Sequence, residues 1–134
     1  MSATLVDSNV ILDVATEDVE WLDWSASMLS DAAEHGPIVI NPVIYAEVST
    51  RYETIEALDE ALPSNFYTRA PLPWEAAFLA AKVFLQYRRR GGSKDRPLPD
   101  FFIGAHAAVA GLTLLTRDAR RYRIYFPKLR LMAP

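Results

Sequence analysis

Short apolar runs alternate along this chain with longer stretches in which apolar residues recur at helical spacing. The short runs predict β-strands at residues 3–6, 37–40, 66–69, 113–115 and 128–132. The longer stretches predict helices over residues 10–14, 21–35, 42–51, 54–62, 74–90 and 100–111. Strands that alternate with helices are typical of an α/β domain, so we expect a mostly parallel sheet of four or five short strands.

Two of the expected helices have distinct surfaces. The helix that begins at Pro73-Trp74 and ends at Gly91-Gly92 has a predicted buried face of Trp74, Ala77, Phe78, Ala81, Phe84 and Leu85. A loop is expected over residues 93–99, and the helix after it is rich in small residues that suit close packing on a sheet. The spacing of Trp21, Trp24 and Trp74 favours the core or a dimer surface over stacking on bases.

The composition restricts the class of protein. The 134 residues suit one domain, residues 1–134, and 51% hydrophobic residues suffice for one core. The chain has no cysteine, which excludes disulfides and thiolate chemistry and is compatible with a reducing compartment. No apolar run approaches the roughly 20 residues of a membrane span. A signal peptide has a basic segment before its apolar stretch, and no such segment precedes the first apolar stretch here. We therefore expect a soluble cytoplasmic protein without a membrane partner.

The net charge of −3 hides a division of the chain into an acidic and a basic part. Residues 1–87 contain 14 acidic and 3 basic residues, a net charge of −11, whereas residues 88–134 contain 3 acidic and 11 basic residues, a net charge of +8. This asymmetry favours an anionic ligand on one side of the molecule, although two separate solvated faces would also produce it. Two of the three acids in the basic part, Asp100 and Asp118, stand where a site is expected.

Four acidic residues occupy settings that usually exclude charge. Asp7 directly follows the first expected strand, and Asp118 stands three residues after the strand at 113–115. Asp100 opens a predicted helix after Leu98-Pro99, and Glu47 interrupts an otherwise apolar helical stretch. Acidic side chains rarely lie beside core segments unless something balances their charge. Because sites in parallel sheets form beyond the carboxyl ends of the strands, we expect these four acids to meet there.

Carboxylates grouped without histidine or cysteine predict a hard divalent cation, Mg²⁺ or Mn²⁺. Acids at close range oppose each other's ionisation, and a bound cation removes that cost. Such an ion can receive phosphate oxygens and activate a water, so the pattern predicts a metal-dependent nuclease. Each acid also has a purely structural interpretation: Asp7, Asp100 and Asp118 as helix N-caps, and Glu47 as an exposed helical residue.

These residues, in their order and spacing, resemble a known pattern. Asp7-Ser8-Asn9 after the first strand, Glu47 after Asn41-Pro42, Leu98-Pro99-Asp100, and Thr116-Arg117-Asp118 before Tyr122 resemble the motifs of PIN domains. Within that family they are most similar to the VapC-type toxins of bacterial toxin–antitoxin modules, and the resemblance covers nearly the whole chain. It implies a three-layer α/β sandwich, in which helices flank a central, mostly parallel sheet.

The resemblance also implies an activity and its residues. A VapC-type protein is a Mg²⁺-dependent endoribonuclease, for which Mn²⁺ can substitute, and it is usually a homodimer that a separate antitoxin chain neutralises. Asp7, Glu47 and Asp100 would be the core metal ligands, and Asp118 the fourth acid. Asn9 would orient Asp7 or a water, and Thr116 would support the site by hydrogen bonding. The next segment, 119–121, lacks the acid or Asn that relatives often carry there, which leaves the number of metals open.

Two basic segments accompany the acids. The first supplies the candidate RNA-binding residues Arg88, Arg89, Arg90, Lys94 and Arg96. Contacts from Arg and Lys to phosphates provide most sequence-independent affinity for nucleic acid, but a solvated helix end explains the first segment equally well. The second segment is Arg117, Arg120, Arg121 and Arg123, beside Asp118. Arg117 is a further RNA-binding candidate, and an arginine here could bind the scissile phosphate or balance the acids.

Several alternatives stay open. His106 lies six positions after Asp100, well around the helix from it, which favours a packed or partly exposed histidine over a general base. A receiver-like signalling domain has a similar size and an early acid, but Arg117 stands where it needs a lysine. A non-catalytic RNA-binding module would use only the basic part, and a DNA-directed nuclease would use the same acids.

Overall fold

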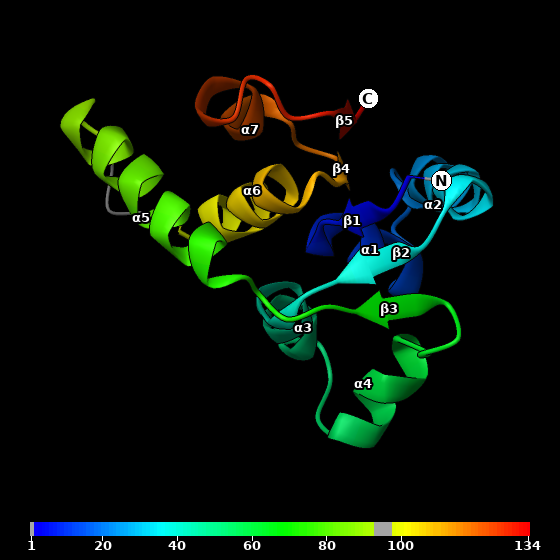
Figure 1. Ribbon diagram of the computed structural model, residues 1–134. Helices are drawn as coiled ribbons and strands as arrows, with labels where there is room; N and C mark the ends of the chain where they lie inside the picture. The colour runs from blue at the N-terminus through cyan, green and yellow to red at the C-terminus, as the bar shows by residue number, and fades with distance from the viewer. Residues whose placement is uncertain (1, 93–97) are drawn as a thin grey trace.

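The computed structural model of the chain, which describes residues 2–92 and 98–134, contains a sheet of five short strands. The strands are β1 (Thr4–Val6), β2 (Ile38–Ile40), β3 (Tyr67–Arg69), β4 (Thr113–Leu115) and β5 (Leu131–Met132). All neighbouring pairs are parallel, and the strands lie in the order β3-β2-β1-β4-β5 (Figure 1). The predicted α/β fold with a parallel sheet flanked by helices is confirmed.

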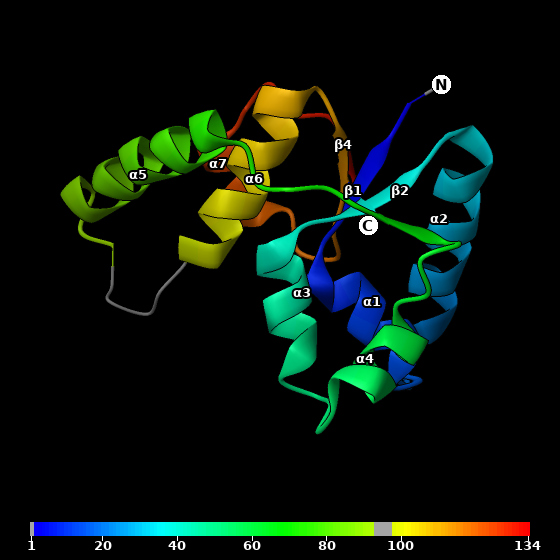
Figure 2. The same cartoon turned by 60° about the horizontal axis from the view of Figure 1, so that its bottom comes forward.

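Seven helices occur in these two described ranges. They are α1 (Ser8–Ala15), α2 (Leu22–His35), α3 (Pro42–Ser49), α4 (Ile55–Ala61), α5 (Trp74–Arg89), α6 (Leu98–Ala110) and α7 (Arg120–Tyr125). Three of them start where a side chain caps the first turn, namely Asp7 for α1, Asn41 for α3 and Thr54 for α4. Figures 1 and 2 both show α5 alongside α6 and reaching away from the sheet. None of the described helices has the length and apolar character that crossing a membrane requires.

The strand order creates a junction at the centre of the sheet. From β1 the chain moves outward to β2 and β3, and it then returns to the other side of β1 to form β4 and β5. Ligands of parallel sheets bind beyond the carboxyl ends of the strands where the order reverses, which here is between β1 and β4. The register pairs Val6 with Leu115. The residues that follow these two strands therefore leave the sheet side by side.

The central strands are buried on both faces, which explains their continuous apolar sequences. Leu5, Val6, Leu114 and Leu115 are completely buried, and Ile40 is 1% exposed. Burying one such side chain contributes about 1.5–3 kcal/mol, so strands of three residues are enough to anchor the sheet. The junction is thus a rigid base for the side chains beyond it.

Helix α6 packs closely because its inner face is made of small residues. Gly104, Ala105 and Ala107 are buried, and a Cβ atom added to Gly104 would lie 2.5 Å from the ring of Phe126. At the end of the helix Gly111 adopts a φ of 68°, a left-handed conformation that glycine adopts without strain and that turns the chain into β4. The position of α6, and of the site residue in its first turn, is therefore fixed relative to β4.

The long helix α5 buries a different face from the predicted one. Its buried residues are Ala76, Ala80 and Val83. Trp74 is 88% exposed and Phe78 is 67% exposed, so the predicted buried face is wrong. Apolar residues occur nearly all round this helix, and the periodicity cannot choose among its faces. The small residues lie inside because they let α5 approach its neighbour closely.

Two further boundaries differ from the prediction. Helix α6 begins at Leu98 and not at Asp100, because Pro99 is tolerated in a first turn, where its missing N–H has no helical partner anyway. The rest of the loop expected at 93–99 lies outside the described residues. Helix α7 is absent from the predicted elements, because Tyr122 is its only buried residue among the described positions and no apolar repeat marks it.

Candidate functional site

Three of the four predicted acids gather beyond the junction of β1 and β4. Asp7 is the first residue after β1, Glu47 lies on α3, and Asp100 lies in the first turn of α6. Helix α3 reaches the site because Asn41, directly after β2, caps it through a hydrogen bond from the Ile44 amide (2.9 Å). The sheet and two helix starts thus bring together residues separated by up to 93 positions of sequence.

Asp7 is the most enclosed of these acids, with 4% of its surface exposed. Its Oδ1 accepts a hydrogen bond from the Ser8 amide at 2.8 Å. Its Oδ2 accepts one from the Thr116 hydroxyl at 2.8 Å and one from the Tyr122 hydroxyl at 3.0 Å. Hydrogen bonds hold this carboxylate in one orientation, and no basic side chain in the described part of the chain bonds to it.

Glu47 and Asp100 have partners that differ in charge. The Ser8 hydroxyl donates a hydrogen bond to Oε1 of Glu47 at 2.9 Å. The Arg121 guanidinium donates to Oδ2 of Asp100 at 2.7 Å, and both side chains are about one-third exposed. Helix α7 therefore contributes Tyr122 to Asp7 and Arg121 to Asp100, which makes it part of the site.

The pKa values of the three acids show that they act on one another. Burial is the main cause that raises the pKa of Asp7 to about 6, and the negative charges of Asp100 and Glu47 add to it. Burial also raises the pKa of Glu47, and Asp100 raises it further. The pKa of Asp100 is raised by burial and by Asp118, although Arg121 opposes the shift. Like charges close to each other in a buried setting favour a positive ion between them.

Asp118 differs from the other three because it is half exposed and has its own counter-ion. The Arg120 guanidinium donates to both carboxylate oxygens at 3.2 Å. These bonds lower the pKa of Asp118. Asp118 therefore lies at the rim of the acidic site, close enough to act on Asp100 but directed toward α7.

The donor set suits a hard cation, since every acid offers carboxylate oxygens and none of the four stands beside a sulfur ligand. As they stand, no three His, Cys, Asp or Glu side chains within residues 2–92 and 98–134 are close enough together to hold a metal ion. The side chains of Glu47 and Asp100 are turned toward Ser8 and Arg121. Joint coordination by these acids would require the two side chains to turn toward Asp7.

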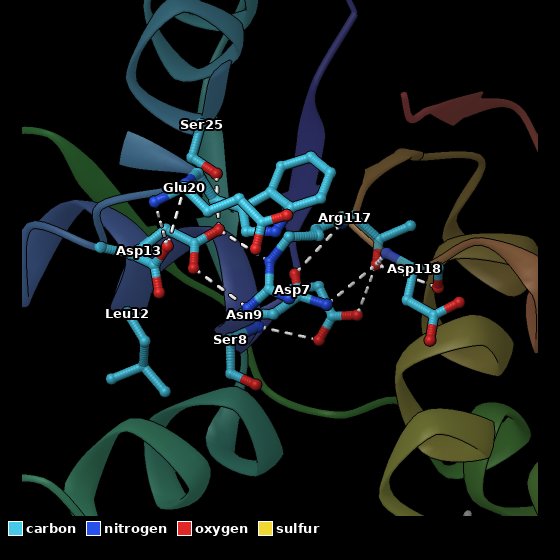
Figure 3. A network of polar contacts seen from close by, with 12 residues as sticks. Asp7, Ser8, Asn9, Leu12, Asp13, Glu20, Ser25, Arg117 and Asp118 are labelled. Carbon is cyan, nitrogen blue, oxygen red and sulfur yellow. Dashed lines mark hydrogen bonds and ion pairs between the residues drawn. The ribbon is translucent and has the colours of Figure 1, made fainter. Parts of the chain in front are cut away.

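The predicted supporting residues connect α1 to the loop after β4 (Figure 3). Asn9 donates to the Thr116 hydroxyl oxygen at 3.4 Å and accepts from the Arg117 amide at 3.2 Å. Thr116 is completely buried, and its oxygen also accepts from the Asp118 amide at 3.2 Å. Asn9 therefore reaches Asp7 through Thr116 and not directly.

Beyond this loop a second acid, Asp13, is paired with Arg117 (Figure 3). Arg117 Nε and Nη2 donate to the two carboxylate oxygens of Asp13 at 2.9 and 3.0 Å, and the Ser25 hydroxyl donates to Oδ2 at 2.8 Å. Asp13 is 2% exposed. The guanidinium of Arg117 also lies 5.4 Å from the ring centroid of Trp21, within range of a cation–π contact. Arg117 is thus bound within the protein, which argues against its predicted role in holding RNA.

Three of the other candidate RNA-binding residues lie at the carboxyl-terminal end of α5. Arg88, Arg89 and Arg90 are exposed, and the guanidinium of Arg90 lies 5.6 Å from the ring centroid of Tyr125 on α7. The end of α5 therefore borders the side of α7 that faces away from Trp21. Lys94 and Arg96 lie outside the described residues.

His106 is packed inside the protein, as the helical geometry favours. It is 2% exposed, and its Nδ1 accepts a hydrogen bond from the side-chain amide of Asn41 at 2.9 Å. Burial lowers the pKa of this imidazole, so it is neutral near pH 7. Because Asn41 caps α3, the contact positions the helix that carries Glu47.

Sequence reasoning assigned no role to three residues of this arrangement. Tyr122 and Ser8 each bond to a site acid, and Asp13 binds Arg117. Ser8 and Tyr122 had a signal, since Ser8 lies within the Asp7-Ser8-Asn9 motif and Tyr122 follows the Thr116-Arg117-Asp118 motif. The partner of Asp13 is 104 positions away, and nothing local in the sequence indicates it.

Comparisons with known proteins agree with this geometry. Residues 4–127 match the PIN domain family, and no curated protein matches the chain. A chain in the crystal structure of VapBC2 from Rickettsia felis bound to a DNA fragment from its promoter superposes with a TM-score of 0.74 at 16% identity, over 98% of each chain. VapBC-1 from nontypeable Haemophilus influenzae gives 0.73 at 14% identity, over 98% of this chain and 97% of that one. FitAcB from Neisseria gonorrhoeae gives 0.61 at 19%, over 96% of each chain.

Proposed function

Because the chain belongs to the PIN domain family, we propose that it is a metal-dependent endoribonuclease and the toxin of a toxin–antitoxin pair. One observation carries the proposal. The carboxylates of Asp100 on α6 and Glu47 on α3 are near enough to raise the pKa of Asp7 beyond β1, and Asp7, the most buried of the three, bonds to no basic side chain among the described residues. A site of this charge and chemistry suits Mg²⁺ or Mn²⁺ and, through it, a phosphodiester.

In this proposal the acids hold the ion. Asp7, Glu47 and Asp100 would be its carboxylate ligands, and Asp118 would be a fourth acid at the rim. When bound, Mg²⁺ would activate a water for attack on phosphorus and stabilise the negative charge that develops. Thr116 and Tyr122 keep the carboxylate of Asp7 in place through their hydroxyls. Arg121 balances the charge of Asp100 before the ion binds.

The proposed partners are an antitoxin chain and a second copy of this chain. The chain superposes on VapBC structures, and the structure of VapBC-5 from Mycobacterium tuberculosis is described as a member of the VapBC family of toxin–antitoxin systems, which supports an antitoxin partner. The exposed apolar side chains of α5, Trp74, Phe78 and Leu85, support a homodimer, because exposed apolar patches mark protein interfaces. The four-residue spacing of Trp74 and Phe78 places them on one face of the helix.

The decisive test is induction of the chain and of Asp7→Asn in a bacterial host, followed by mapping of RNA ends. We expect growth arrest with the natural chain and more than about a 10³-fold loss of cleavage with Asp7→Asn, because a metal site contributes several kcal/mol to such a reaction. Asp59→Asn, at an exposed acid on α4, is the matched control and should arrest growth normally. The cut ends should carry 5′-phosphate and 3′-hydroxyl groups, and 2′,3′-cyclic phosphates would contradict the mechanism. Tight RNA binding without cleavage would indicate a non-catalytic module.

A further inference from the structure

Two hollows open on either side of Asp118. One, of about 380 Å³, is lined by Trp21, Arg117, Asp118, Ala119, Arg120, Arg123 and Pro134. The other, of about 420 Å³, is lined by Tyr87, Asp118, Arg120, Arg121, Ile124 and Tyr125. Both volumes are within the range of about 300–1,000 Å³ that holds small ligands. Asp118 and Arg120 belong to both walls, so the hollows meet at the rim of the acidic site.

Arginine side chains supply positive charge along this surface. The side chain of Arg123 makes no hydrogen bond or ion pair with any residue in the described ranges and is exposed. Arg120 has an 87% exposed side chain, and its pair with Asp118 is a surface ion pair that is easily exchanged for another anion. Arg90 extends the positive surface past Tyr125 at the far end. Three guanidinium groups thus follow one path across the rim.

Aromatic rings border the same path at both ends. Trp21 stands beside Arg123 and Arg117 in the first hollow, and Tyr125 and Tyr87 stand in the second, with ring centroids 6.0 Å apart. Guanidinium groups that bind phosphates, together with rings on which bases stack, are the combination that binds single-stranded nucleic acid without strong sequence preference. A double helix presents paired bases whose faces are covered, so it cannot use the rings in this way.

We propose that a single strand of RNA lies across α7, from Trp21 and Arg123 over Asp118 to Tyr125 and Arg90, so that its phosphate chain passes the acidic site. The proposal rests on the proposed nuclease function only for the identity of the nucleic acid. It omits Arg117 as an RNA contact, because that guanidinium binds Asp13, and it adds Arg120 and Arg123. The strand occupies both hollows and therefore extends on both sides of Asp118.

The test is fluorescence anisotropy with a labelled single-stranded RNA in EDTA, where no cleavage occurs, over a series of salt concentrations. Each lost phosphate contact should reduce the slope of log affinity against log salt by about 0.7, which is roughly a fivefold weaker affinity at 0.1 M salt. We expect this change for Arg123→Gln and for Arg90→Gln. Lys128→Gln is the matched control, because it removes the same charge from an exposed residue. Lys128 lines a separate hollow with Gly111, which lies just before β4 and therefore at the amino ends of the strands, away from the acids. This substitution should leave the slope unchanged.

The outcomes separate this proposal from the proposed function. If Arg123→Gln and Lys128→Gln behave alike, or if duplex RNA binds as tightly as the single strand, the path across α7 is wrong, and cleavage by the natural chain would still support the nuclease. If Arg123→Gln alters the slope but the natural chain cleaves no RNA in Mg²⁺ or Mn²⁺, the path stands and the nuclease proposal fails. Tighter binding of single-stranded DNA than of RNA would overturn the assignment of RNA. Circular dichroism of all three variants checks that each is folded.

Discussion

A buried aspartate lies near each end of α1, and the two differ in whether a basic side chain pairs with the carboxylate. Asp7, at the start, receives three neutral donors, faces two other acids, and has a pKa raised to about 6. Asp13, two residues before the end of the helix, accepts hydrogen bonds from Nε and Nη2 of Arg117 and from the Ser25 hydroxyl (Figure 3). The two residues are six positions apart and equally hidden from solvent. The negative charge of Asp13 is compensated by an arginine, whereas Asp7 bonds to no basic side chain in the described part of the chain.

The comparison of Asp13 with Asp7 distinguishes an acid that stabilises the fold from one that we propose for the metal site. A buried charge is costly unless it is paired, so a protein that leaves one unpaired loses stability at that position. Asp13 shows that this chain can pair a buried aspartate with arginine where the fold alone is concerned. Under the proposed function, binding of a cation that prefers the folded protein would recover the stability lost at the unpaired Asp7.

The largest expected effect comes from removing the ion pair between Asp13 and Arg117 at the end of α1. Asp13→Asn leaves Arg117 without its partner and should lower the free energy of unfolding by about 3 kcal/mol, the low end of the range for buried pairs because Arg117 is one-third exposed. Urea denaturation measures this. Asp59→Asn breaks a pair of similar length, Asp59 to Arg69 at 2.8 Å, in an exposed place and should change stability little. Equal effects of the two substitutions would show that burial of Asp13 is unimportant.

A smaller effect is expected from removing a hydrogen bond to Asp7 at the start of α1. Thr116→Val removes the hydroxyl that bonds to Asp7, and the affinity for Mn²⁺ should fall about 10–100-fold, as is typical when a ligand's hydrogen-bond partner is lost. Electron paramagnetic resonance of free Mn²⁺ measures the affinity. Thr116→Ser keeps the hydroxyl and should restore most of it, whereas Thr113→Val, at the other end of β4, should have no effect. Unchanged Mn²⁺ affinity in Thr116→Val would remove Asp7 from the proposed ligand set.

The smallest effect is a difference in pH dependence. In the folded protein the pKa of Asp7 is about 6, above the ordinary value of 3.8. Protonated Asp7 therefore contributes fully to the stability of the fold below pH 4, and this contribution is lost as the pH rises through 6. Without divalent cations, the stability of Asp7→Asn relative to the natural chain should therefore be greater at pH 8 than at pH 5, by about 1–1.5 kcal/mol. Thermal and urea unfolding in EDTA measure it. A relative stability independent of pH would mean that Asp7 has an ordinary pKa in the folded protein.

The sequence was sufficient to predict which elements of the fold carry three of the acids. Asp7 follows a short apolar run, as does the loop with Thr116 and Asp118, and parallel strands place such ends at one edge. Glu47 could be placed because Asn41-Pro42 is a recognisable helix start, and the structure has that cap. These signals are local, and each lies within a few residues of the position that it predicts.

The features that could not be predicted depend on contacts between distant residues. Arg117 looked like a free basic residue, and only the fold brings Asp13 to it. The buried face of α5 depends on which neighbour the helix packs against, and Trp74 and Phe78 are exposed because Ala76 and Ala80 fit α6 better. Tyr122, the buried residue of α7, donates a hydrogen bond to Asp7, which lies 115 positions earlier in the chain.

The distance along the chain between Asp7 and its two hydroxyl donors has a consequence for synthesis on the ribosome. Thr116 and Tyr122 are 109 and 115 positions after Asp7, and β4 pairs directly with β1. Asp7 is synthesised before both residues that orient it, so its carboxylate is held in place only after β4 and α7 have been made and have joined β1. A chain that ends before β4 lacks both hydroxyl donors of Asp7.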